Sequence, residues 1–221
     1  MSESPHRPSV PFLHLPVARL VASVTSRDRM VSDAAERRAS VAAIFHVPAP
    51  DAEAPSAVPG WGDVSVLLIR RSDAPGDPWS GHMAMPGGKQ EPDDIDLVHT
   101  AIRETEEEVG LTLDRDAQLI GALDDVPAFA RGRRTGLVVT PHLFVLTGAG
   151  PRPPLRPSYE VQESLWVPVS RLLAPDSRRE RVYDVEGVSM RLPAWDYDGR
   201  LIWGLTHHML SGLLRLAGES T

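Results

Sequence analysis

The chain has 221 residues and a mass of 24.1 kDa, with 42% hydrophobic and 24% charged residues. This composition is ordinary for a globular protein and excludes a wholly disordered or collagen-like chain. The net charge of −7 means that the average surface repels nucleic-acid phosphates and anionic membranes. Because the chain contains no cysteine, disulfides, thiolate catalysis and cysteine-bound zinc are excluded as well.

The N-terminal segment does not have the pattern of a secretion signal. Four prolines fall within the first 16 residues, where a signal peptide needs an unbroken apolar core. No stretch approaches the ~20 apolar residues of a membrane-spanning helix. We therefore expect a cytoplasmic protein. We divide it into an N-terminal arm and helix, residues 1–37, and one main domain, residues 38–221.

Hydrophobic patterning predicts strands and helices in alternation after the arm. Residues 17–40 have helical texture, and short apolar or β-branched runs predict buried strands. The sequence Asp-Tyr-Asp-Gly at 196–199 is typical of a hairpin turn, and residues 201–216 have helical spacing. The predicted strands are residues 40–47, 64–69, 137–146 and 164–168.

The clearest predicted helix covers residues 93–111. Its apolar positions fall within a ~100° arc when plotted at ~100° per residue. Asp93 or Asp94 can cap its start, and Gly110 can end it. The residues in the arc are Val98, Ala101, Ile102, Thr105 and Val109.

The end of this helix carries an unusual cluster of acids. Four of the five residues 104–108 are glutamates, where the helix dipole already presents negative charge. Two such charges ~6 Å apart repel by about 2 to 3 kcal/mol, and an Arg103–Glu107 pair offsets only a few tenths of a kcal/mol. Hard divalent cations prefer oxygen ligands of this kind. The alternative is a solvated acidic face.

A glycine pair before the helix favours the metal site over the solvated face. Gly87 and Gly88 allow the backbone to turn tightly and to approach a ligand closely. The pair would place backbone amides and carbonyls beside the groove that the carboxylates line. Either feature alone is weak evidence, and the combination is specific.

The run from Gly87 to Leu111, GGKQEPDDIDLVHTAIRETEEEVGL, resembles the Nudix box. The second half, from Arg103 to Leu111, matches that pattern, with Thr105 at a position that is usually apolar. The first half departs from it, because Asp94 replaces the usual glutamate and one extra residue separates it from Arg103. The longer spacing is similar to that of the coenzyme A pyrophosphatase branch, although Trp79-Ser80-Gly81 replaces a histidine-containing motif of that branch.

The resemblance implies an α/β fold, the Nudix-type α/β/α sandwich with a mixed sheet and a loop–helix–loop catalytic motif. It implies a hydrolase that cleaves the phosphoanhydride of a nucleoside diphosphate linked to another moiety, with a coenzyme A-like substrate favoured. Mg²⁺ or Mn²⁺ would be bound by Glu104, Glu107 and Glu108, and Arg103 would orient a glutamate of the cluster. Glu107 would take part in catalysis directly.

Other residues are candidates for the base and for substrate contacts. Glu160 is preferred over Glu163 as general base, although both could be loop glutamates. Substrate contacts are expected from Gly87 and Gly88, from Trp79 by stacking on a base, and from three arginines that suit phosphate oxygens. Packing against the core, or an exposed loop, is the alternative for each of these side chains. The arginines are Arg131, Arg133 and Arg134.

Two other functions remain open. One is hydrolysis of nucleotide sugars, ADP-ribose or nucleoside triphosphates, which the missing histidine motif favours. The other is a Nudix-fold module that binds a nucleotide without cleaving it, against which the retained acids argue. The sequence predicts a small-molecule partner, no nucleic acid and no membrane, and it leaves a homodimer open.

Overall fold

The computed structural model describes residues 14–33, 35–48, 60–130, 132–146, 152–185 and 188–221. Within these ranges, eight strands form one mixed sheet with the order β3-β2-β1-β7-β5. β4 pairs with β1, β6 with β7, and β8 with β2. The strands are β1 (Arg37–His46), β2 (Ser65–Arg71), β3 (Met83–Ala84), β4 (Gly87–Lys89), β5 (Ala117–Ala122), β6 (Val126–Ala130), β7 (Arg133–Leu146) and β8 (Val161–Pro168).

The centre of the sheet is a long parallel pair. β1 and β7 are parallel over ten residue pairs, from Arg37–Leu137 to His46–Leu146, and all the other pairings are antiparallel. Parallel strands are usually covered on both faces and rich in apolar residues. β1 and β7 fit this rule, because nearly every residue in their second halves is buried.

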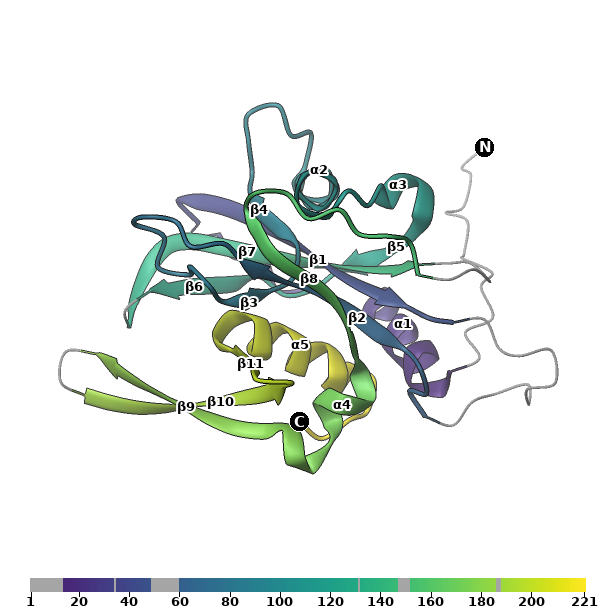
Figure 1. Cartoon of the computed structure of the whole chain (residues 1–221). Coiled ribbons are helices and arrows are strands. Elements are labelled where there is room, and N and C mark those ends of the chain that lie inside the picture. The colour runs from purple at the N-terminus through teal and green to yellow at the C-terminus, as the bar shows by residue number, and fades with distance from the viewer. Residues whose placement is uncertain (1–13, 34, 49–59, 131, 147–151, 186–187) are drawn as a thin grey trace.

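Helices cover both faces of this sheet, so the predicted α/β/α sandwich is confirmed (Figure 1). α2 and α3 lie on one face, and α1 and α5 lie on the other. The short helix α4 follows β8. The helices are α1 (Leu15–Ser26), α2 (Leu97–Val109), α3 (Leu113–Asp116), α4 (Val169–Leu173) and α5 (Gly204–Leu216).

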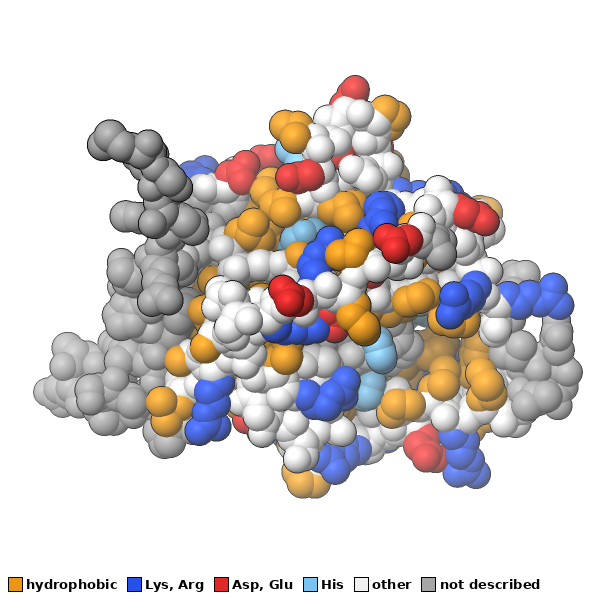
Figure 2. Space-filling view, turned by 180° about the vertical axis from the view of Figure 1, so that it is seen from behind, with side chains coloured by type: hydrophobic (Ala, Val, Ile, Leu, Met, Phe, Trp, Pro, Cys, Tyr) orange, Lys and Arg blue, Asp and Glu red, His pale blue; other side chains and the backbone are white. Residues whose placement is uncertain are grey.

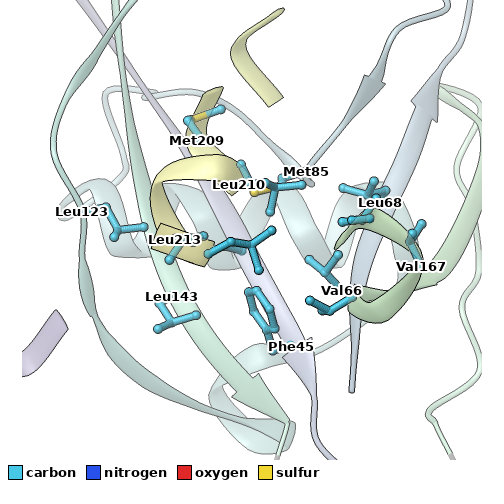
Figure 3. Close-up of a cluster of buried hydrophobic side chains, with 14 of the residues drawn as sticks. Phe45, Val66, Leu68, Met85, Leu123, Leu143, Val167, Met209, Leu210 and Leu213 are labelled. Atoms are coloured by element: carbon cyan, nitrogen blue, oxygen red, sulfur yellow. The ribbon is translucent and has the colours of Figure 1, made fainter. Parts of the chain in front are cut away.

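Two hydrophobic cores follow from the alternation of side chains along the strands. In β1, Ala43 and Phe45 point into the core shared with α1 and α5, and Ala42 and Ile44 point into the core shared with α2. Figure 3 shows the first core, where Phe45 lies among side chains of β2, β7 and α5. The sheet is therefore fixed between two buried layers, and the strand register cannot slip without exposing one of them.

A second, three-stranded sheet lies on the α5 side of the molecule. It has the order β11-β10-β9, with β9 (Arg178–Val185), β10 (Val188–Tyr197) and β11 (Arg200–Trp203) all antiparallel. Figure 1 shows the β9–β10 hairpin extending beyond the main sheet, below β3 and β6. The turn predicted at residues 196–199 joins β10 to β11, with Asp198 at φ 49° and Gly199 at φ 79°. The sequence did not predict β9 or β10.

The helix predicted over residues 17–40 is wrong in its second half. α1 ends at Ser26, and β1 begins at Arg37, which is also the last residue of the expected N-terminal segment. Between them the chain is held by Asp124 and Asp125, which accept hydrogen bonds from the backbone N–H groups of Met30 and Ser32. These side-chain acceptors replace helical carbonyl partners, so the helix stops.

The other predicted elements are confirmed with shifted ends. β1, β2, β7 and β8 contain the four predicted strands almost entirely. The last predicted helix is shorter at its start, because residues 201–203 pair with β10 before α5 begins. Among the described residues, no helix has both the length and the apolar composition needed to cross a membrane.

Candidate active site

The glycine pair predicted from the sequence lies on β4, directly beside the acidic helix α2. Gly87 has φ 149°, and a Cβ at that position would lie 2.2 Å from the carbonyl oxygen of Ser40 on β1. At Gly88, a Cβ would lie 2.3 Å from Oε1 of Glu104. The first glycine therefore permits strand pairing, and the second leaves room for a carboxylate of the cluster.

The start of α2 differs from the prediction. Asp96, and neither Asp93 nor Asp94, caps the helix by accepting a hydrogen bond from the N–H of His99 at 2.8 Å. Asp94 is buried and binds Arg103 instead, because its two carboxylate oxygens accept from Nε and Nη2 at 2.9 Å each. His99 and Thr100 also contact Asp94. With the extra residue in the motif, Asp96 caps the helix while Asp94 anchors Arg103.

Arg103 links this anchor to the acidic cluster. Its Nη1 donates to Glu104 Oε1 at 3.2 Å and to Glu107 Oε2 at 3.1 Å, and its Nη2 donates to the carbonyl of Lys89. The hydrogen bonds from Arg103 hold the pKa of Asp94 far below its usual value, so the pair stays charged. The guanidinium is therefore fixed in orientation and fixes two of the glutamates.

Glu108 is the most buried acid of the cluster. Only 3% of the residue is exposed, its Oε2 accepts a hydrogen bond from the N–H of Gly87 at 2.9 Å, and its Oε1 lies 4.0 Å from Nη1 of Arg71. Burial, with a contribution from the charge of Glu104, raises the pKa of Glu108 to about 7. Burial likewise raises the pKa of Glu104. The charged form of both carboxylates is therefore disfavoured mainly because burial removes them from water.

Glu160 lies close to this cluster, although it is 52 positions from Glu108 in sequence. The loop before β8 packs along the end of α2, where the N–H groups of Arg156 and Ser158 donate to the carbonyls of Val109 and Glu108. The charge of Glu160 contributes to the raised pKa values of Glu104 and Glu108. Glu163, the other predicted base, is bound instead to the guanidinium of Arg200.

The carboxylates suit a divalent cation in chemistry but are not preassembled around one. In the part of the chain that the structure describes, no three acidic or histidine side chains converge as a ready-made metal site. Glu104 and Glu107 are both turned to Arg103. Because burial and mutual repulsion raise the pKa values of Glu104 and Glu108, a hard cation would relieve an existing electrostatic penalty.

A groove of about 1140 Å³ runs from the glycine pair to the β9–β10 hairpin. Figure 2 shows its hollow in the right half of the view, with hydrophobic side chains inside and basic side chains at its edge. Gly87, Gly88, Arg71 and Trp79 line it. None of the glutamates of α2 lines this groove, but Gly87 and Gly88 do. Glu108 accepts from the N–H of Gly87, and Glu104 lies against Gly88, so the acids lie next to one end of a space large enough for a nucleotide derivative.

Two of the three predicted arginines are described, and they lie at the edge of this groove, because Phe129 and Gly132 beside them line it. Arg133 and Arg134 are exposed at the start of β7, and Arg134 stacks over Phe129 with 5.9 Å between its Cζ and the ring centroid. Neither lines the groove, and Arg131 lies outside the described residues. The structure adds Arg71, which sequence spacing did not single out.

Comparison with known proteins places this arrangement in a family. Residues 57–185 match the model of the NUDIX domain. An uncharacterized protein of Schizosaccharomyces pombe is 37% identical over 159 residues, which cover 67% of this chain and 46% of that protein. Mitochondrial coenzyme A diphosphatase NUDT8 of Homo sapiens is 34% identical over 164 residues, which cover 72% of this chain and 66% of that protein.

A plant relative shows a similar partial match. Nudix hydrolase 15, mitochondrial, of Arabidopsis thaliana is 31% identical over 153 residues, which cover 67% of this chain and 51% of that protein. The chain thus spans between about half and two thirds of the length of these relatives.

Proposed function

The chain belongs to the Nudix family, and on that premise we propose that it hydrolyses the phosphoanhydride of a nucleoside diphosphate linked to another moiety, with Mg²⁺ or Mn²⁺ as cofactor. The observation that carries the proposal is the acid cluster of α2, in which Glu104 and Glu108 are largely withdrawn from water and have raised pKa values. These two acids lie against Gly88 and Gly87, which line one end of a large groove. A solvated acidic face would need neither the burial nor the groove.

The residues that would hold the cation are Glu104, Glu107 and Glu108. When bound, the cation supplies neutralisation of the diphosphate and acidification of the attacking water. Arg103 contacts Glu104 and Glu107 and would set their orientation, while Asp94 keeps the guanidinium in place. Glu107 is the most exposed of the three, with 59% of its side chain accessible, so it is the one best placed to meet a ligand entering from solvent.

Glu160 is the proposed general base. It is exposed, makes no ion pair with a basic side chain in the part of the chain that the structure describes, and lies within electrostatic reach of Glu104 and Glu108. A base must be free to accept a proton near the reacting atoms. Glu163 does not meet this condition, because Arg200 binds both of its carboxylate oxygens.

Substrate contacts are proposed for Gly87, Gly88 and Trp79, which line the groove. Arg131, Arg133 and Arg134 are kept as contacts for an additional phosphate of a long substrate. A coenzyme A-like substrate is favoured, since a relative that aligns with 72% of this chain is named a coenzyme A diphosphatase. The size of the groove supports a substrate with an extended second half.

The test is a substrate panel in Mg²⁺ or Mn²⁺. Coenzyme A, dephospho-coenzyme A, ADP-ribose, a nucleotide sugar and a nucleoside triphosphate are compared, with products identified by phosphorus NMR. Turnover that disappears with EDTA and with Glu107→Gln supports the proposal. Glu106→Gln is the matched control, because Glu106 lies on the same helix and bonds only to Thr112 among the described side chains.

The panel also separates the alternatives. The phosphate products distinguish a coenzyme A-like substrate from nucleotide sugars or triphosphates. Binding of Mn²⁺, measured by paramagnetic resonance, tests the cation site without turnover, and unchanged binding in Glu107→Gln contradicts that assignment. Tight nucleotide binding without hydrolysis under either cation would favour the non-catalytic module and refute the hydrolase.

A further inference from the structure

The far end of the groove is rich in aromatic rings. The chain has five Trp, three Tyr and four Phe, and five of these twelve side chains line this one groove. A hydrophobic core normally absorbs such side chains. Trp195 follows this rule, since only 2% of it is exposed, and Trp79 is partly buried against the same core. The partly exposed rings of Tyr183 and Trp203 and the exposed ring of Phe129 need another reason. The five side chains that line the groove are Trp79, Phe129, Tyr183, Trp195 and Trp203.

Three rings from separate segments meet at the wall formed by the small sheet. The ring of Trp203, at the end of β11, lies 4.7 Å from that of His82 and 5.4 Å from that of Tyr183 on β9, measured between centroids. The guanidinium carbon of Arg181 lies 4.8 Å from the centroid of Trp203. The indole ring is thus held on several sides before any ligand arrives, which reduces the entropy lost on binding.

Apolar side chains at the mouth of the groove are left in contact with water. Phe129 of β6 is 49% exposed, and Met190 of β10 is 39% exposed. Both line the groove, and Met190 is the strand partner of Tyr183. Folding does not remove these exposed apolar groups from water, whereas a flat apolar ligand bound in the groove would cover them.

Positive charge accompanies these rings. Arg178, Arg179 and Arg191 line the same end of the groove, in a chain whose net charge is −7. Glu180 also lines it and pairs with Arg191 at 3.0 Å, so two of the three arginines are free of a carboxylate among the described residues. The guanidinium groups of Arg178 and Arg179 donate to backbone carbonyls of Ser220, Asp176 and Arg178. Flat rings next to arginines form a surface that suits a heteroaromatic base attached to phosphates.

We propose that the β9–β11 sheet is the nucleobase subsite of the substrate groove, with Tyr183 and Trp203 packing against the base. This inference rests on the proposed function, because the diphosphate would lie at the Gly87–Gly88 end of the same groove. The main sheet and α2 then act on the diphosphate, while the small sheet selects for the nucleoside. An extended apolar arm at this wall is the competing occupant.

The test compares two non-hydrolysable probes that differ by the nucleoside. α,β-Methylene adenosine diphosphate and methylenediphosphonate are titrated calorimetrically in Mg²⁺. The wild type is expected to bind the first at least about tenfold more tightly than the second. Tyr183→Ala should weaken the nucleotide probe by about tenfold, as expected for loss of one base–aromatic contact, and leave methylenediphosphonate within twofold.

Two further variants control this measurement. Val182→Ala changes the neighbouring residue of β9, which is 56% exposed and does not line the groove, and it should bind both probes like the wild type. Trp203→Phe keeps a ring, and it should reduce the change in tryptophan fluorescence that the nucleotide probe causes; an unchanged signal would contradict a contact with Trp203.

The outcomes separate this inference from the proposed function. Equal wild-type affinity for both probes, or equal weakening of both by Tyr183→Ala, overturns the base subsite and favours an apolar arm. A protein that hydrolyses nothing in the substrate panel, yet shows the selective loss, refutes the hydrolase and leaves the base subsite standing.

Discussion

Replacing Glu108 by glutamine is expected to stabilise the protein in the absence of divalent cations. Glu108 is almost fully buried, and its Oε2 accepts a hydrogen bond from the N–H of Gly87. A glutamine has nearly the same shape, and its amide oxygen can accept the same bond. The change therefore removes a buried negative charge that repels Glu104, and it leaves the packing intact.

The expected gain follows from the pKa of Glu108, which is raised from 4.5 to about 7. As the pH rises above 4.5, the unfolded chain loses this proton first, while the native protein keeps it until about pH 7. The contribution of Glu108 to the free energy of unfolding is therefore fully present below pH 4.5 and is lost as the pH rises through 7. A shift of about 2.5 units, at 1.36 kcal/mol each, amounts to about 3 kcal/mol.

Thermal unfolding in EDTA at pH 4 and pH 8 measures this difference. Glu108→Gln should match the wild type at pH 4, and at pH 8 its Tm should be higher by roughly 6 to 12 °C for a chain of this size. Glu106→Gln, an exposed change on the same helix, should lie within about 0.5 kcal/mol of the wild type. Added Mn²⁺ should stabilise the wild type more than Glu108→Gln. An equal Tm at pH 8, or an equal gain at both pH values, would refute the reasoning.

Three further predictions concern the neighbours of this residue. Asp94→Asn should lower the free energy of unfolding by about 3 kcal/mol, measured with denaturant, because it leaves the guanidinium of Arg103 without its bidentate partner. Gly88→Ala should lower kcat by roughly tenfold or more while Tm changes little, since the new methyl group would lie 2.3 Å from the Glu104 carboxylate. Glu160→Gln should lower kcat by roughly 100-fold. Glu163→Gln should change kcat less than twofold, because it removes only the partly exposed pair with Arg200. Equal effects of the two variants would contradict the assignment of the base.

The strands of the main sheet were predictable because their apolar runs are local. β1 and β2 are buried on both faces, and their sequences show it directly. The segment after α1 was not predictable in this way. Its helical propensity is overridden by hydrogen bonds that its backbone N–H groups donate to Asp124 and Asp125, almost a hundred residues further along the chain. Local propensity is a weak guide wherever a distant side chain supplies the backbone partners.

The acid cluster was also predictable, because Arg103, Glu104, Glu107 and Glu108 lie within two turns of one helix. The role of Asp94 was not, since a shifted motif leaves several aspartates as candidates for the cap and for the anchor. Only the structure shows that Asp96 takes the first role and Asp94 the second. Which aspartate takes which role depends on where α2 begins, and the sequence does not fix that position to within one residue.

The small sheet is the part of the groove that the sequence concealed. β9 carries three arginines and few apolar residues, so it lacks the alternation that marks a half-buried strand. β10 does alternate from Val188 to Leu192, but this run is short and Pro193 follows it. The hairpin lines the groove, so we expect one of its sides to face a ligand instead of a protein core. Tyr183 and Trp203, which lie 20 residues apart in sequence, become neighbours only through β10, which pairs with both β9 and β11. A surface assembled in this way is specified by strand pairing, and no spacing within the sequence would reveal it.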